Sequence, residues 1–166
     1  GIVLDDVEPK KVAQQLFDSA FQNSGQVCIA MKRLYVHDSI YDEVVDELAA
    51  IANDTIIGDG LEQGTKLGPL QNKMQYEKVK ELIESARQDG NIVAGGEVPD
   101  QSGYFIRPTI VRDVMEGSRI VDEEQFGPVL PVIRFSDESD AIARANNSDY
   151  GLGGSVWSSD LDRAYD

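Results

Sequence analysis

The chain has 166 residues, of which 41% are hydrophobic and 27% are charged, a balance that suits one globular domain with a substantial core. Thirty acidic residues against fifteen basic ones give a formal net charge of -15, which repels phosphate backbones and anionic lipid headgroups and argues against nucleic acid or membrane partners. One cysteine and one histidine provide neither an internal disulfide nor a thiol–imidazole zinc set, so no metal site is expected. No apolar run of about eighteen residues and no leader-like opening is present, so we expect a cytoplasmic protein.

Apolar β-branched runs alternate with helical periodicity through the first third of the chain. Strands are predicted at residues 2–4 and 33–36, and helices are predicted over residues 9–22 and 39–52, the second helix opening at a Ser39 cap. This alternation is typical of a layered α/β domain.

The remainder of the chain continues the same pattern. Pro69 precedes a long amphipathic helix near residues 73–88, which Gly90 ends. Ser136 or Asp137 is expected to cap a helix that runs through Asn146. Further strands are predicted at residues 92–94, 104–106, 109–111, 129–135 and 153–157. We therefore predict one α/β domain over residues 1–166, with a layered, mostly parallel sheet and flanking helices.

Both ends of the sequence fall inside predicted elements. The chain opens on a strand pattern without an initiating Met, and it stops within a helical pattern over residues 160–166. Natural termini seldom fall inside elements that need neighbours for burial, so we expect a piece of a longer protein.

Cys28 is the best candidate nucleophile. It lies in the run Phe21-Gln-Asn-Ser-Gly-Gln-Val-Cys28, between a predicted helix and a predicted strand, and Gly25 can give access to the sulfur. The competing interpretation is a buried structural thiol, because free cysteine is among the most buried residue types.

Two other features favour a structural role. His37 could pair with Cys28 in a cysteine hydrolase, but it follows a predicted strand and precedes a probable helix start, where a half-exposed turn histidine is typical. Gly95-Gly96 leads to Pro99 and not to a helix N-terminus, so it is predicted to form a turn and not a phosphate-binding loop.

Four runs resemble the aldehyde dehydrogenase superfamily in order and spacing, and the resemblance covers essentially the whole chain. The Gly-Gln-x-Cys run ending at Cys28 and the Glu-x-Phe-Gly-Pro run beginning at Glu124 are each fairly specific. The weaker runs are Gly68-Pro69 before a helix that carries Gln75, and Asn146-Asn-Ser-Asp-Tyr-Gly-Leu152.

The resemblance implies an oxidoreductase that uses NAD or NADP to convert a small-molecule aldehyde to a carboxylic acid. Cys28 would attack the aldehyde to form a thiohemiacetal, hydride transfer would leave a thioester, and water would release the acid. The Cys28 amide would contribute to the oxyanion hole, whereas Asn23 is expected to be a turn residue.

The resemblance also assigns cofactor contacts. Glu124 would hydrogen-bond the nicotinamide ribose, because its hydroxyls need fixed acceptors, and Phe126 would pack against the nicotinamide ring. Gln75 matches a glutamine that in some relatives contacts the adenosine ribose. Without the resemblance, Glu124 belongs to a solvated acidic turn, Phe126 to the core and Gln75 to a helix surface.

Several parts of the family pattern are not found in this sequence. The glutamate base of a Glu-Leu-Gly-Gly run, the oxyanion asparagine and the cofactor-binding domain are expected upstream of Gly1, and the tunnel and subunit-interface segment beyond Asp166. We therefore expect most of the catalytic domain of a homo-oligomeric parent, poorly active or inactive alone. A coenzyme A-acylating dehydrogenase and a non-catalytic binding or scaffold module of the same fold remain alternatives.

Overall fold

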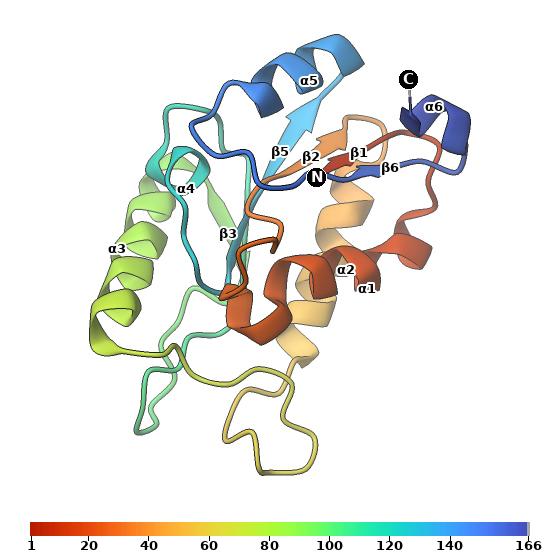
Figure 1. Ribbon diagram of the computed structural model, residues 1–166. Helices are drawn as coiled ribbons and strands as arrows, with labels where there is room; N and C mark the ends of the chain where they lie inside the picture. Colours follow the sequence, from red (N-terminus) through yellow and green to blue (C-terminus); the bar gives the residue numbers. More distant parts are fainter. Residues whose placement is uncertain (166) are drawn as a thin grey trace.

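Six strands form one sheet in the computed structural model, which describes residues 1–165 (Figure 1). The strand order is β3-β4-β5-β2-β1-β6, and all neighbours are parallel except β3 and β4. This confirms the predicted α/β class with a mostly parallel sheet. The strands are β1 Ile2–Val3, β2 Leu34–His37, β3 Asn91–Ala94, β4 Thr109–Arg112, β5 Val129–Phe135 and β6 Val156–Trp157.

Helices cover both faces of the sheet, because alternate strand residues point to opposite sides. In β2, Leu34 and Val36 join one buried cluster, whereas Tyr35 joins the other. The first cluster includes residues of α1 (Pro9–Phe21) and α2 (Tyr41–Asp54). The second includes residues of α3 (Lys73–Asp89), α4 (Arg119–Asp122) and α5 (Glu138–Asn146). The domain thus has three layers, with the sheet in the middle (Figure 1).

Local sequence signals explain several helix boundaries. Pro9 occupies the first turn of α1, where its missing N–H costs nothing. The Asn72 side chain accepts from the backbone N–H of Gln75 at 2.9 Å to cap α3, and Asp137 caps α5 as predicted. The Ser39 cap was wrong: α2 begins at Tyr41, and the Ser39 hydroxyl instead contacts His37.

The other boundary errors lie where apolar runs do not enter a regular element. Residues 104–106 are not a strand, because the Tyr104 carbonyl accepts from Leu70 N–H and the segment pairs with a loop. The last strand is shorter than predicted and covers only Val156–Trp157. The helical pattern near the end forms α6 (Leu161–Tyr165), and Asp166 lies outside the described residues.

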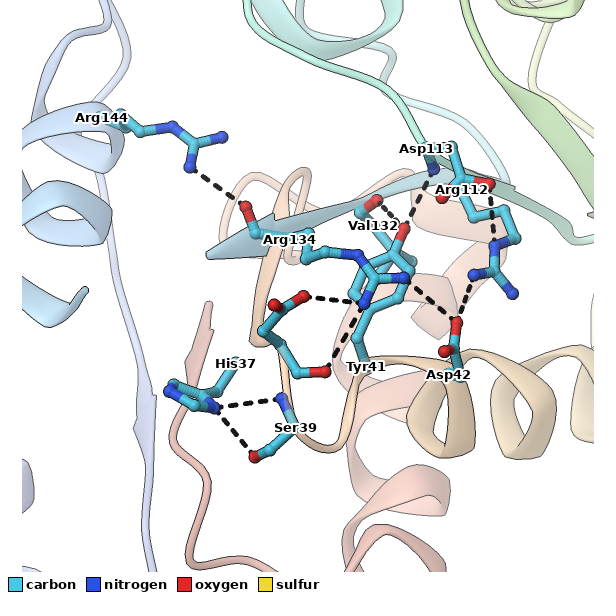
Figure 2. Close-up of polar contacts among 10 residues, drawn as sticks. His37, Ser39, Tyr41, Asp42, Arg112, Asp113, Val132, Arg134 and Arg144 are labelled. Carbon is cyan, nitrogen blue, oxygen red and sulfur yellow. Dashed lines mark hydrogen bonds and ion pairs between the residues drawn. The ribbon is translucent and has the colours of Figure 1, made fainter. Parts of the chain in front are cut away.

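Tyr41 ties α2 to the sheet. Its hydroxyl donates to the Val132 carbonyl at 2.9 Å and accepts from the Asp113 N–H at 3.0 Å (Figure 2). The Arg134 guanidinium carbon lies 3.8 Å from the centre of the Tyr41 ring, within cation–π range. These contacts fix the first turn of α2 against β4 and β5.

Asp6 anchors β6 and α6 to the rest of the domain. One carboxylate oxygen accepts four hydrogen bonds, from the hydroxyls of Ser158 and Ser159 at 2.7 Å each and from the N–H groups of Ser159 and Asp160. Burial alone would raise the pKa of Asp6, but these hydrogen bonds outweigh it and lower the pKa to about 2. The ionised form is therefore favoured in the folded state.

We expect Asp6→Asn to lower the free energy of unfolding by about 1 to 2 kcal/mol at neutral pH. Because the folded pKa of about 2 lies below the usual 3.8, this contribution is present above pH 3.8 and disappears as the pH falls towards 2. Urea titrations of both proteins between pH 3 and 7 measure the difference. A difference that stays constant over this range would contradict the assigned ionisation.

No helix among residues 1–165 is both long and apolar enough to cross a membrane. Over the same residues, no three His, Cys, Asp or Glu side chains gather in an arrangement that could hold a metal ion.

Candidate active site

Two loops meet at one edge of the sheet. The nucleophile loop, residues 22–32, enters β2, and the glutamate loop, residues 123–127, leads into β5. Strands β2 and β5 are parallel neighbours, with Leu34 opposite Val132, so the loops that precede them approach the same amino-terminal edge. The topology thus brings together the two most specific sequence motifs, which are about a hundred residues apart in the chain.

The nucleophile loop has an unusual backbone. Asn23, Ser24 and Gly25 adopt φ values of 50°, 57° and 73°, three successive residues in the left-handed region. Only glycine adopts this conformation freely, and such backbone gathers at sites where the surrounding structure enforces it. The Asn23 side-chain amide donates to the Gln26 carbonyl at 3.2 Å. This confirms that Asn23 is a turn residue.

The loop is held in place by the Gly68-Pro69 segment. The buried Ser24 hydroxyl donates to the Gly68 carbonyl at 2.8 Å, and the Gln26 amide donates to the Pro69 carbonyl at 3.3 Å. The Gln26 side-chain oxygen also accepts from the Gln71 N–H at 2.9 Å. The Gly68-Pro69 run therefore supports the nucleophile loop from the side.

Cys28 is exposed and free at the outer part of this loop. The competing interpretation, that Cys28 is a buried structural thiol, is therefore wrong. Among residues 1–165, no protein acceptor is found for the Cys28 backbone N–H, which leaves it available to an oxyanion beside the sulfur.

Helix α3 holds the main chain of the glutamate loop. Lys78 donates to the Glu124 carbonyl at 2.8 Å, and the Gln75 amide donates to the Gln125 and Phe126 carbonyls at 2.7 and 3.1 Å. Gln75 and Lys78 are three residues apart and so lie on one face of the helix. Phe126 adopts a left-handed φ of 48°, which these contacts help to enforce.

Gln75 thus has a role that the sequence did not indicate. Its amide nitrogen is engaged by two main-chain carbonyls, so this group positions the loop that carries Glu124 and Phe126. Contact between Gln75 and a cofactor stays a prediction.

Gln125 joins the two loops from inside the domain. Its side chain is fully buried, and its amide donates to the Ile120 carbonyl at 2.7 Å and the Lys32 carbonyl at 3.1 Å. The main chains of Gly25 and Gly127 also meet, since a Cβ atom at Gly25 would lie only 2.7 Å from the Gly127 carbonyl carbon. The loops therefore pack backbone to backbone.

Lys32 lies where the two loops face each other. Its ammonium donates to the Gly25 carbonyl and lies 5.0 Å from the centre of the Phe126 ring. Burial lowers the pKa of Lys32 to about 8, while the charges of Glu124 and Cys28 act in the opposite direction. The ring of Phe126 and the charges of Cys28 and Glu124 thus all act on one ammonium group, and both Glu124 and Phe126 are half-buried.

His37 does not join this group. It is the last residue of β2, whereas the nucleophile loop enters the first residue of that strand. Its Nδ1 accepts from the Ser39 N–H at 3.2 Å and lies 2.9 Å from the Ser39 hydroxyl (Figure 2), and its ring meets Phe135 edge to face. This is the half-exposed turn environment predicted for His37, and it does not support a Cys28–His37 hydrolase.

Comparison with known proteins agrees with this arrangement. The model of the aldehyde dehydrogenase family matches residues 1–166, and the chain belongs to that family. It is 42% identical over 166 residues to phenylacetaldehyde dehydrogenase of Pseudomonas fluorescens, covering 98% of this chain and 33% of that protein. It is 39% identical to the NADP(+) succinate-semialdehyde dehydrogenase GabD of Escherichia coli, covering 99% and 34%. The chain therefore spans about a third of the length of these relatives.

Solved structures show the same fold. The NAD+ complex of an aldehyde dehydrogenase from Bacillus cereus has a TM-score of 0.95 and 38% identity, covering 99% of this chain and 34% of that one. Aldehyde dehydrogenase C of Pseudomonas syringae, a cysteine-to-alanine variant in complex with NAD+ and octanal, has a TM-score of 0.94 and 33% identity, covering 99% and 35%. One relative of this chain thus binds NAD+ and an aldehyde together.

Proposed function

We propose that the whole protein oxidises an aldehyde to a carboxylic acid with NAD+ or NADP+, and that Cys28 is its nucleophile. One observation carries the proposal: the loops that hold an exposed thiol and a half-buried carboxylate, which are far apart in the sequence, pack against each other, and both charges act on the Lys32 ammonium. If Cys28 only filled space in the core, its side chain would not be exposed. If Glu124 only belonged to a solvated acidic turn, helix α3 would not need to bind the carbonyls of residues 124–126.

The chemistry of Cys28 follows from its surroundings. The thiolate adds to the aldehyde carbon, a C–S bond forms, and the carbonyl π electrons move onto oxygen, where the Cys28 N–H can stabilise the charge. Loss of hydride from this thiohemiacetal carbon leaves a thioester, and attack by water on the thioester carbon breaks the C–S bond and releases the acid. The thiol is needed because an aldehyde carbon expels hydride only once it is tetrahedral and bears an oxyanion.

The donor set beside Cys28 fits a nicotinamide cofactor. The cofactor, when bound, supplies the acceptor for the departing hydride. Glu124 offers a fixed carboxylate to ribose hydroxyls, which are donors, and Phe126 offers an aromatic face for a planar ring. Helix α3 holds both residues through their main chain, so they are oriented before anything binds.

The whole protein is proposed to be a cytoplasmic homo-oligomer that acts on a small-molecule aldehyde. The 166-residue chain contains no Glu-Leu-Gly-Gly run, the pattern that carries the water-activating glutamate in the family. By itself the chain is therefore proposed to bind cofactor weakly and to turn over poorly or not at all.

The test is reduction of NAD+ and NADP+ by the whole protein with a panel of aromatic, amino, acidic and aliphatic aldehydes, followed at the absorbance of the reduced nicotinamide. We expect reduction without any added acyl acceptor, with a free carboxylic acid as product. Reduction that requires coenzyme A and yields an acyl thioester would support the acylating alternative. No reduction of either cofactor across the panel would support a binding or scaffold module.

A further inference from the structure

We propose that Lys32 is a positioning residue that fixes the nucleophile loop against the glutamate loop and supplies a positive charge that attracts anionic reagents to Cys28. This assignment deepens the proposed function and rests on it for its relevance to turnover. No sequence motif pointed to Lys32, because its role depends on a contact between loops that are distant in the chain.

The position of the ammonium carries the first part of the proposal. Lys32 follows Cys28 by four residues, yet its side chain turns back to donate to the Gly25 carbonyl, which closes the nucleophile loop on itself. The same ammonium lies over the ring of Phe126, and the Lys32 carbonyl accepts from the Gln125 amide at 3.1 Å. Lys32 therefore contacts the glutamate loop through both its side chain and its main chain.

The charges around Lys32 carry the second part. The charges of Cys28, from its own loop, and of Glu124, from the opposite loop, both act on the Lys32 ammonium. On the side of α3, Lys78 donates to the main-chain carbonyl of Glu124. A cation in this position attracts an anionic reagent to the sulfur, and the effect is largest where water is partly excluded, as it is around half-buried Lys32.

The protonation state of Lys32 gives this arrangement a definite pH dependence. Burial lowers the pKa of Lys32 to about 8, so the ammonium is present below about pH 8 and is lost above it. A neutral amine no longer attracts an anion to Cys28. The advantage of an anionic reagent over a neutral one at the sulfur should therefore fall as the pH rises through about 8.

The experiment measures alkylation of Cys28 in the whole protein by neutral iodoacetamide and anionic iodoacetate between pH 6.5 and 9.5, with the labelled peptide quantified by mass spectrometry. At pH 7.5 we expect Lys32→Met to slow labelling by anionic iodoacetate about threefold to tenfold relative to labelling by neutral iodoacetamide, because the positive charge that attracts the anion is removed. Lys32→Arg restores a permanent cation and should label within about twofold of the unchanged protein.

Lys10→Met is the matched control, because Lys10 is an exposed lysine in the first turn of α1 and the substitution removes the same charge. It should leave both labelling rates unchanged. Superimposable rate profiles for Lys32→Met and Lys10→Met, with both proteins folded by circular dichroism, would overturn the proposal.

The pH dependence of labelling in the unchanged protein tests the proposal even if the Lys32 variants do not fold. In that protein the ratio of iodoacetate to iodoacetamide rates should fall through about pH 8, and a ratio that stays flat would also overturn the proposal. None of these rates depends on nicotinamide reduction. Absence of dehydrogenase activity with a normal Lys32 effect would therefore count against the proposed function alone.

Discussion

Cys28→Ala is expected to abolish aldehyde-dependent reduction of NAD+ or NADP+ in the whole protein, lowering kcat by a factor of about 10⁴ or more. Alanine cannot form the C–S bond, so the substrate carbon never becomes tetrahedral with an oxyanion, and hydride has no favourable way to leave. The measurement is steady-state reduction of the cofactor with the best aldehyde found in the panel.

The same substitution should leave the fold intact, because the Cys28 side chain is exposed and fills no core space. Its free energy of unfolding in urea is expected to change by no more than about 0.5 kcal/mol. Nicotinamide binding, followed by fluorescence quenching, should also be retained. Residual activity near that of the unchanged protein would show that another residue is the nucleophile.

Gly25→Ala is expected to have the largest effect on stability, lowering the free energy of unfolding by about 3 kcal/mol or more. Gly25 adopts a φ of 73°, which alanine adopts only with strain. Its added methyl group would also meet the Gly127 carbonyl, at 2.7 Å from the carbonyl carbon, so the two loops must separate. Because the loops carry Cys28 and Glu124, kcat should fall as well.

Gly60→Ala is the matched control for this prediction. A Cβ atom at Gly60 would meet nothing within 4 Å, and Gly60 lies in an exposed turn. The substitution should change the free energy of unfolding by no more than about 0.5 kcal/mol in either direction. Equal midpoints for Gly25→Ala and Gly60→Ala in urea would contradict the close packing of the two loops.

Periodic segments were predictable because their signals are local. The helix from Lys73 and the long strand ending at Phe135 were found from spacing and apolar character, and Asp137 was one of the two residues named as a cap. Each of these elements buries one face, so its apolar residues recur at the spacing of a helix or a strand.

The strand predicted at residues 104–106 was wrong because this apolar run has no strand to pair with. Residues 104–106 bury Ile106 in the core, yet they are followed by Arg107-Pro108, and the Tyr104 carbonyl is used by Leu70. An alternating pattern indicates burial, but a strand also needs a partner with free backbone groups. That information is not contained in the run itself.

The candidate site was only partly predictable for a related reason. Cys28, Glu124 and Phe126 belong to motifs and could be named from the sequence, and in the structure all three act on one ammonium. Lys32 and Gln125 could not be named, since each acts through a contact between distant loops. The one available signal for Gln125 was an uncharged amide between Glu124 and Phe126, which suggests an inward-facing side chain.

The side chains that shape the two loops act almost entirely on main-chain carbonyls. Ser24, Gln75, Lys78 and Lys32 each donate to a backbone carbonyl. Every amino acid carries such a carbonyl, so these bonds do not depend on the side chain of the residue that supplies the acceptor. Outward-facing positions such as Ile29, next to Cys28, can therefore diversify without altering the path of the loop. This frame allows new side chains to be sampled around an unchanged candidate site.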